Sequence, residues 1–534
     1  MSLPRLPYTG GIAARGQAGF GGLDHSPGAS DGALWNMENL TGDCFPLLAV
    51  RPRRHTAGAL AAPNGLFAAG TLYYVDGAKL YADGEEKATL PAAGEKTLLA
   101  MGERLLIFPD KALWTENGGL VPLEARAART GLVFGNGTYA GEDAAANSIT
   151  TDGDAFPFRA GDAVSISGCA ARPENNLTLI IREVSGDGKT LRFYENSFTL
   201  PEGETSVTEA GTVTLARNVP DMDFLCVNEN RVWGCKGDAI FASKLGDPFN
   251  WNVFDGVATD AWSVESGSPG SFTACVSYLG YPVFFKEDRI FKVYGGKPSA
   301  FQLMSSAVLG VSPGSDKSLA VAGETLFYLS RAGVAAYNGG VPSVISGPFG
   351  AWRFQNAAGG SDGLKYYVSM RETGSGAWSL FVYDTLRRMW HREDGLHVLR
   401  MAWRDGLYAL TAAGELVLLG TPPAVPEGAA EESAVEWSAE FADWTMGGFD
   451  GKYPVRLRMR FEGDAGAYVA VKLQYDSGGD WETAAEETPG TKRSVYLALP
   501  IRRCDHFRLK LEGTGAVRLY ALSWEYYDGT YPRK

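Results

Sequence analysis

The stretch Asn228 to Trp251 holds a hairpin pattern that recurs along most of the chain and limits what the chain can fold into. Its first half forms a short apolar strand around Val232 and Trp233, turns at Lys236-Gly237-Asp238, and returns through Ala239 to Phe241. Further copies of this two-strand pattern open at Gly70, Gly102, Gly280, Gly323, Gly363 and Gly406.

The spacing of the copies predicts a β-propeller. They recur about every 35 to 50 residues, except for one interval of more than 120, and a period of about 40 to 50 residues is the range in which each blade of a propeller forms one small antiparallel sheet. No apolar pattern with a period of 3.6 persists, which excludes a helical solenoid. We therefore expect an all-β fold with a propeller of six or seven blades, and a set of unrelated hairpins in a large β-sandwich is the alternative.

Two further β domains are expected beside the propeller. One long interval between the second and third copies has alternating strands of its own, which predicts an inserted small β-barrel or sandwich at residues 131–218. A run rich in Pro, Ala and Glu after Gly420 reads as a linker, and the alternation that follows predicts a C-terminal β-sandwich at 433–534. The propeller then occupies 61–130 and 219–422. Residues 1–60 form an N-terminal segment, in which the strand Phe45 to Val50 is expected to close the propeller.

The charge of the chain bounds its partners. It carries 62 acidic and 49 basic residues, for a formal net charge of −13. An acidic surface repels phosphate backbones, so tight binding of DNA or RNA by the whole chain is not expected. The basic run Arg51, Arg53 and Arg54 reads as a solvated turn, or as a candidate interface with a partner or nucleic acid.

Motifs for catalysis and metal binding are missing from the sequence. Only five His occur, without a G-x-S-x-G elbow, an H-E-x-x-H motif or a Cys quartet. The turn Asp476 to Trp481 resembles those of sialidase blades, but it occurs once and a hairpin explains it. The six Cys are far apart and are expected as reduced thiols. We therefore expect no catalytic residues, no metal site, no cofactor and no enzyme activity.

No targeting or membrane segment is expected either. The opening residues Met1 to Pro7 lack an apolar run of signal-peptide length, and no stretch is long and apolar enough to span a bilayer. The chain is therefore expected to be made in a cytoplasm.

Three segments together resemble virion proteins of tailed bacteriophages, and more narrowly the tail nozzle or packaged-DNA stabilisation proteins. The most specific is Asn230-Arg231-Val232-Trp233-Gly234 with Ser243 and Asp247-Pro248. The others are Gly21-Gly22-Leu23 with Asn39-Leu40 and Leu48 to Pro52, and Asp505 to Leu511 with Gly513.

The resemblance implies a structural role in the tail or neck of a virion. Such proteins form homo-oligomeric rings, here expected with six copies, that contact portal and other tail proteins and line the channel through which double-stranded DNA leaves. Arg51, Arg53, Arg54, Asp247 and Pro248 are then the interface or channel candidates. Carboxylates on the bore would let DNA pass without sticking.

Other functions stay open beside this one. The chain is expected alternatively to be a carbohydrate-binding or glycan-hydrolysing propeller used in host attachment, a minor tail or baseplate protein, or a cellular propeller scaffold. A glycan site needs aromatic side chains at loop tips beside carboxylates. The aromatics Tyr73, Trp114, Trp233, Phe284 and Phe327 lie mainly in expected strands and read as blade core.

Overall fold

The computed structural model describes residues 12–30, 32–136, 147–194, 197–445 and 451–528, so the opening residues Met1 to Pro7 lie outside the described part. These residues form strands and four single-turn 3₁₀ helices, which confirms the all-β class. The helices are η1 (Pro173–Asn175), η2 (Pro298–Ala300), η3 (Asp316–Ser318) and η4 (Gly347–Phe349). Among the described residues no helix is long and apolar enough to cross a membrane.

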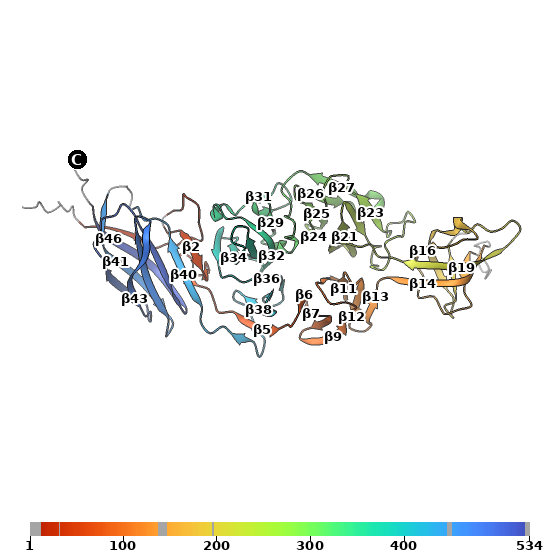
Figure 1. Cartoon of the computed structure of the whole chain (residues 1–534), viewed down its shortest axis with the longest axis horizontal. Coiled ribbons are helices and arrows are strands. Elements are labelled where there is room, and N and C mark those ends of the chain that lie inside the picture. Colours follow the sequence, from red (N-terminus) through yellow and green to blue (C-terminus); the bar gives the residue numbers. More distant parts are fainter. Residues whose placement is uncertain (1–11, 31, 137–146, 195–196, 446–450, 529–534) are drawn as a thin grey trace, which may run out of the picture. The chain divides into compact units, whose positions relative to one another are not determined.

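Six of the sheets in the described part of the chain contain four antiparallel strands that follow one another in sequence order, and a seventh joins three such strands to two strands from elsewhere in the chain (Figure 1). The first three are β6 (Pro63–Ala69), β7 (Thr71–Asp76), β8 (Lys79–Ala82) and β9 (Glu85–Thr89); β10 (Thr97–Met101), β11 (Arg104–Phe108), β12 (Ala112–Thr115) and β13 (Gly119–Pro122); and β20 (Phe224–Asn228), β21 (Arg231–Lys236), β22 (Ala239–Ala242) and β23 (Trp262–Glu265). The expected hairpin at Val232 is therefore confirmed as β21 and β22, with Trp233 opposite Ala242.

Three more four-stranded sheets and the five-stranded sheet follow after β23. They are β24 (Ala274–Tyr278), β25 (Tyr281–Lys286), β26 (Arg289–Tyr294) and β27 (Gln302–Ser306); β28 (Ala320–Ala322), β29 (Thr325–Ser330), β30 (Gly333–Tyr337) and β31 (Ser343–Val344); β32 (Phe354–Ser361), β33 (Lys365–Glu372), β34 (Trp378–Asp384) and β35 (Met389–Arg392); and β36 (Val398–Trp403), β37 (Leu407–Thr411) and β38 (Glu415–Leu419) with β5 (His55–Ala59) and β39 (Ala430–Glu431).

The chain divides into two compact units. Unit 1 comprises Met1–Gly70 and Ser312–Lys534, and unit 2 comprises Thr71–Val311. Within unit 2, β20 contacts β10 on one side and β24 on the other. Within unit 1, β28 contacts β32, β32 contacts β36, and β36 contacts β6. In both units, neighbouring sheets therefore meet through the first strand of each sheet.

The prediction that the strand Phe45 to Val50 closes the propeller is wrong, as its pairing shows. The segment Phe45 to Val50 contributes β4 (Leu48–Val50), which pairs with β3 (Leu40–Thr41) and with β46 (Val517–Asp528). Leu48 and Ala49 are buried there, because these apolar side chains are removed from water in the C-terminal sandwich. It is β5 that adds to the edge of β38, with His55 opposite Leu418.

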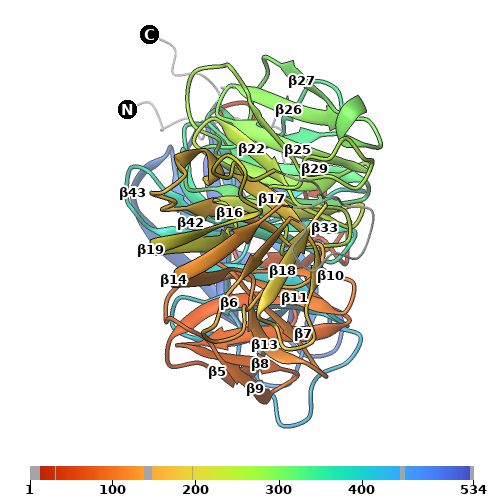
Figure 2. The ribbon, with the colours of Figure 1, turned by 90° about the vertical axis from the view of Figure 1, so that its right-hand side faces the viewer.

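Unit 2 contains a closed barrel of six strands (Figures 1 and 2). Its core is apolar and includes Phe134, Ile149, Val164, Ile181 and Leu215, each buried. Of the two forms expected for the insertion at residues 131–218, a barrel or a sandwich, the structure has the barrel. In the order in which they pair around the barrel, its strands are β14 (Ala125–Gly135), β15 (Ser148–Thr150), β18 (Thr190–Phe193), β17 (Thr178–Val184), β16 (Ala163–Ser167) and β19 (Ser206–Arg217).

Unit 1 ends in a two-sheet sandwich built from both ends of the sequence. One sheet has the order β3-β4-β46-β41-β44, with β1 (Ala13–Gln17) also on β46, and the other has the order β2-β40-β45-β42-β43. The remaining bounds are β2 (Leu34–Glu38), β40 (Glu436–Phe441), β41 (Lys452–Gly463), β42 (Tyr468–Tyr475), β43 (Gly478–Glu487), β44 (Arg493–Ala498) and β45 (Phe507–Thr514).

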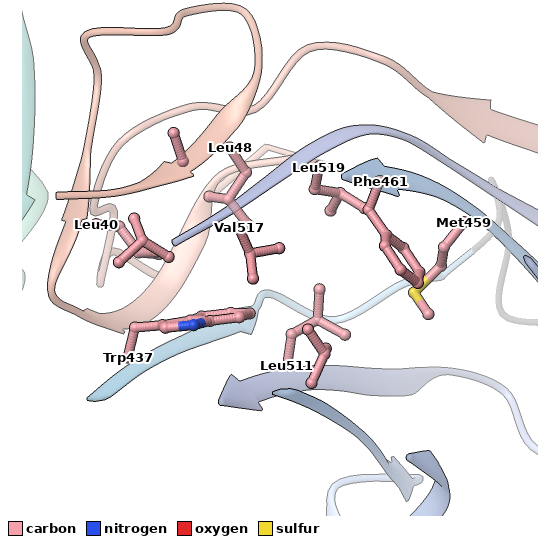
Figure 3. A pocket seen from close by; sticks show the side chains of 11 residues that line it. Leu40, Leu48, Trp437, Met459, Phe461, Leu511, Val517 and Leu519 are labelled. Atoms are coloured by element: carbon pink, nitrogen blue, oxygen red, sulfur yellow. The ribbon is translucent and has the colours of Figure 1, made fainter. Parts of the chain in front are cut away.

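Figure 3 shows a gap in the core between these two sheets. Apolar side chains surround it, among them Leu40, Trp437, Phe461, Leu511 and Leu519. Its volume of about 10 Å³ is at the lower limit for a single water molecule, so it cannot hold an organic ligand. The gap is a packing defect of the core and not a binding site.

Candidate functional site

The basic run predicted as an interface is mostly buried in unit 1. Arg51 donates to both carboxylate oxygens of Glu432, at 2.7 and 2.9 Å. Arg54 donates to Glu393 and Asp394, each at 2.6 Å. Burial alone would lower the pKa of Arg54, but attraction to these two carboxylates raises it above its ordinary value. Arg51 and Arg54 therefore neutralise buried carboxylates, which leaves them unavailable to phosphate groups.

Arg53 differs from its two neighbours because its side chain is 44% exposed and pairs only with the exposed Glu431, at 3.3 Å. It lies at an open cleft of about 890 Å³ in unit 1, whose lining mixes both signs of charge, including Glu462 and Arg518. The cleft presents no group of aromatic side chains. The role of the run at an interface or channel stays a prediction.

Asp247 and Pro248 lie in unit 2 and shape the connection between β22 and β23. The Asp247 carboxylate accepts hydrogen bonds from the Phe249 amide at 3.0 Å and from the Asn250 side chain at 2.7 Å, and the Pro248 carbonyl accepts one from Trp251 at 2.9 Å. The structure thus gives this pair a turn-forming role, in a different unit from Arg51, Arg53 and Arg54. Its expected role in the channel stays a prediction.

A cavity of about 260 Å³ between sheets β20–β23 and β24–β27 gathers several side-chain types that the sequence places far apart. Two tight turns bring its walls together: Glu229 and Asn230 have φ of 47° and 57°, and Leu279 and Gly280 have φ of 52° and 79°. Two successive residues with positive φ are the mark of the type I′ hairpin. The lining includes Asn228, Glu229, Arg231, Trp233, Leu245, Tyr281, Pro282, Val293 and Phe301.

Polar groups fix the mouth of this cavity. Asn228 joins the two sheets, because its Oδ1 accepts a hydrogen bond from Ser277 at 2.8 Å and its Nδ2 donates to the Gly280 carbonyl at 3.4 Å. The neighbouring Glu229 side chain is exposed. The cavity wall therefore presents a fixed amide beside a carboxylate that is open to solvent.

Aromatic rings form the rest of the wall. Trp233 and Phe301 lie with ring centroids 5.3 Å apart, and Tyr281 lies 4.7 Å from Tyr294. Tyr281 is 38% exposed, whereas Trp233 is buried and its Nε1 has no hydrogen-bond partner. Buried indole N–H groups normally find an acceptor. The wall thus combines an exposed tyrosine ring with the buried ring of Trp233 and the partly buried ring of Phe301.

Arg231 adds a buried positive charge at the same wall. Its guanidinium donates to the carbonyls of Ser243 and Ala258, each at 2.8 Å, and to that of Asp260. Burial lowers the pKa of Arg231, and nearby Asp260 opposes that shift. Within the described part of the chain, no carboxylate forms an ion pair with this guanidinium.

Tyr281 and Phe301 were not predicted as site residues from the sequence. Trp233 and Phe284 were predicted as blade core, and both are buried, although Trp233 also lines the cavity. The local signal was the position of each missed ring: Tyr281 directly follows the turn at Gly280, and Phe301 follows Gly295-Gly296. Aromatic side chains next to such turns lie at loop ends, where binding residues concentrate.

Comparison with known proteins gives no family for this chain. No family model matches it, and neither does any curated protein. Among solved structures it is similar to the exo-β-1,3-galactanase of Phanerochaete chrysosporium bound to galactose, at 11% identity over 55% of this chain and 92% of that one, with a TM-score of 0.22. It is also similar to a glycoside hydrolase, at 9% identity over 89% and 94% with a TM-score of 0.17. A third match is the dihydro-heme d1 dehydrogenase NirN, at 11% identity over 73% of both chains with a TM-score of 0.30.

These matches correct one expectation. All three proteins are enzymes, two of them glycoside hydrolases, so the expectation that this chain is not an enzyme is contradicted. TM-scores of 0.30 or less transfer neither a fold nor individual residues. The function is therefore argued from the residues of this chain.

Proposed function

We propose that this chain is a carbohydrate-active β-propeller protein and that the cavity lined by Trp233 and Tyr281 binds a glycan. The carrying observation is the combination of an exposed tyrosine ring, a wall formed by the rings of Trp233 and Phe301, and fixed polar groups in one cavity of about 260 Å³. Sugar rings have apolar faces that pack on aromatic rings and hydroxyls that accept and donate hydrogen bonds. A mostly apolar cavity with a few convergent polar groups suits such a ligand.

The strand topology supports the propeller part of the proposal. Six four-stranded antiparallel sheets with sequential strand order, and a seventh in which β36, β37 and β38 are joined by β5 and β39, supply the number of sheets that a seven-bladed propeller requires. Within each unit, neighbouring sheets meet through their first strands, as inner strands of blades do. The pairing of β5 with β38 completes the last sheet with a strand from the N-terminal segment, a known way to close a ring of blades.

The size of the cavity supports a small part of a glycan as the bound group. Pockets for drug-sized ligands have volumes of roughly 300 Å³ and above. At about 260 Å³, this cavity suits one or two sugar rings, with the remainder of a longer glycan in solvent. The exposed carboxylate of Glu229 lies where the bound ring would meet solvent.

A glycan microarray with the full-length chain tests the proposal, followed by calorimetry on the glycans that bind. Tyr281→Ala removes the exposed ring and is expected to cost about 1 kcal/mol, roughly a fivefold rise in Kd. The matched control is Tyr496→Ala, which removes a Tyr that is 61% exposed in the sandwich and should leave Kd unchanged. Equal effects of the two substitutions, or no binding on a broad array, would reject the proposal.

The same glycans should be assayed for cleavage by release of reducing ends, because the matched solved structures include glycoside hydrolases. Glu229→Gln then tests the one carboxylate that lines the cavity. A role as the ring-forming nozzle of a virion stays a prediction from the sequence resemblance, and no observation on the described residues favours it.

A further inference from the structure

A second cluster of reactive side chains lies at one end of the sandwich. It belongs to unit 1, whereas the glycan cavity belongs to unit 2. The hairpin between β42 and β43 turns through Asp476 and Ser477, with Tyr475 opposite Gly478. Both turn residues have positive φ, 52° and 49°. Two successive residues with positive φ form the type I′ turn of this hairpin, which places the Ser477 side chain at its tip.

The hydroxyl of Ser477 points to a histidine. Ser477 Oγ lies 2.7 Å from His506 Nε2, and the other ring nitrogen, Nδ1, is hydrogen-bonded to Oδ1 of Asp505. A carboxylate can only accept, so Nδ1 carries the proton. Nε2 is then left with its lone pair toward the serine, which is the tautomer that a general base needs.

The neighbouring groups hold this arrangement in place. The Asp476 amide donates to the His506 carbonyl at 3.1 Å, and Asp476 Oδ1 accepts a hydrogen bond from the Asp505 amide at 2.9 Å. Burial alone would raise the pKa of Asp505, but hydrogen bonds from His506 and attraction to its ring lower it, which keeps Asp505 ionised at neutral pH. Three other charged groups lie here. Asp443 Oδ1 is 3.5 Å from Ser477 Oγ, and its Oδ2 is 4.0 Å from His506 Nε2. Arg508 lies 3.4 Å from Asp443, and Lys452 donates to the Asp505 carbonyl at 3.5 Å.

The serine is also accessible. Asp476, Ser477 and Gly478 are exposed, and a side chain added at Gly479 would meet open space. A carbonyl group attached to a large substrate can therefore approach Ser477 Oγ without the chain opening. Sequence motifs did not reveal the cluster, because it has no G-x-S-x-G elbow and its members lie 29 residues apart in the chain.

We propose that Ser477, His506 and Asp505 form a catalytic triad that hydrolyses short acyl esters carried on an exposed substrate. Ser477 Oγ attacks the ester carbonyl carbon while His506 Nε2 takes the hydroxyl proton. The ester C–O bond then breaks, and the alcohol leaves with that proton. Water attacks the acyl-serine, gives a proton to Nε2, and the acid departs as serine recovers its proton. Asp505 acts as a positioning residue that holds the imidazole and stabilises its cation.

A rival use of the same residues is a metal site. Ligand atoms of Asp476, Asp505 and His506 all lie within 4.8 Å of one another. A divalent cation there would need His506 Nε2 or Nδ1, both of which are already hydrogen-bonded. The proposal therefore predicts activity that does not depend on added cation and survives a chelator.

The test uses the full-length chain with p-nitrophenyl acetate and with a fluorophosphonate probe that labels activated serines. Labelling is expected at Ser477, located by peptide mass spectrometry, and Ser477→Ala should lower esterase activity by at least about 100-fold. Ser494→Ala, at an exposed serine of β44 in the same sandwich, is the control and should keep full activity. Circular dichroism of each variant checks that the fold is unchanged.

His506→Gln should abolish probe labelling, because no general base remains. Asp505→Asn should lower kcat with little change in KM and should alter the pH profile of kcat, effects that a merely structural change would not produce together. Activity retained in Ser477→Ala, labelling at another serine, or activity lost on chelation would each overturn the triad.

Discussion

Replacing Arg54 by Ala removes the cation from a buried network and should destabilise unit 1 strongly. Arg54 and Glu393 are 9% and 8% exposed and lie 2.6 Å apart, so Glu393 would keep only Arg51, at 3.8 Å. Breaking a buried pair by removing one partner costs about 3 to 5 kcal/mol, because an uncompensated charge stays buried. The neighbouring exposed pair Arg53–Glu431 is the control, and Arg53→Ala should cost only about 0 to 1 kcal/mol.

The measurement is hydrogen exchange with mass spectrometry in a urea series, read on the peptides that contain β5 and β38. These strands pair next to the network, so their opening free energy reports its loss. A difference of at least about 3 kcal/mol between Arg54→Ala and Arg53→Ala is expected. Equal opening free energies for the two variants would refute the assignment of Arg54 to a buried structural network.

Acid gives a second reading of the same network. The pKa values of Asp394 and Glu432 are lowered in the folded chain. Burial alone would raise them, but the attraction of Arg54 and Arg51 outweighs burial. A carboxylate with a depressed folded pKa contributes stability that is complete above its unfolded pKa and lost as pH falls through the folded one. The stabilisation should therefore be lost progressively as the pH falls below about 4, and Arg54→Ala should remove the part of this pH dependence that comes from Asp394.

Three further changes test other parts of the structure. Burial lowers the pKa of His391 to about 4. Between about pH 6.5 and 4 the unfolded chain therefore binds a proton more readily than the folded chain, and the free energy of unfolding should fall as the pH is lowered through that range. His391→Gln should flatten this slope in urea titrations at different pH values. Gly513→Ala should destabilise the sandwich by several kcal/mol in thermal scans, because its Cβ would lie 1.9 Å from the Tyr468 carbonyl oxygen, whereas Gly490→Ala, whose Cβ meets open space, should not. Asn250→Ala should raise hydrogen exchange in the barrel, because the Asn250 side chain accepts a hydrogen bond from the Ala163 amide at 2.9 Å. Unchanged exchange would show that this hydrogen bond does not stabilise the barrel.

Local patterns were enough to predict the repeated hairpins. The Gly-opened strands around Leu72, Phe284 and Leu326 appear as β7, β25 and β29, because alternation and turn residues act over a few positions. The strand at Phe45 to Val50 was placed in the wrong sheet for the opposite reason. Its partner, β46, lies at the far end of the chain, and a short apolar strand carries no local sign of which distant edge it joins.

The sites were less predictable than the strands. The run Arg51 to Arg54 reads as surface charge, since its carboxylate partners lie hundreds of positions away at Glu393 and Glu432. Tyr281 could have been marked from its place beside Gly280, but its approach to Trp233 depends on how two sheets pack. The Ser477 and His506 pairing depends equally on two connections meeting at one end of the sandwich.

The indole N–H of Trp233 offers the most direct test of the glycan cavity. Its signal in a ¹⁵N-tryptophan spectrum of the full-length protein can be assigned by its disappearance in Trp233→Phe. We expect a saturable shift of this one signal when a glycan that binds on the array is added, because a sugar ring bound in the cavity changes the surroundings of the Trp233 ring in its wall. A glycan that binds while the Trp233 signal stays in place would contradict it.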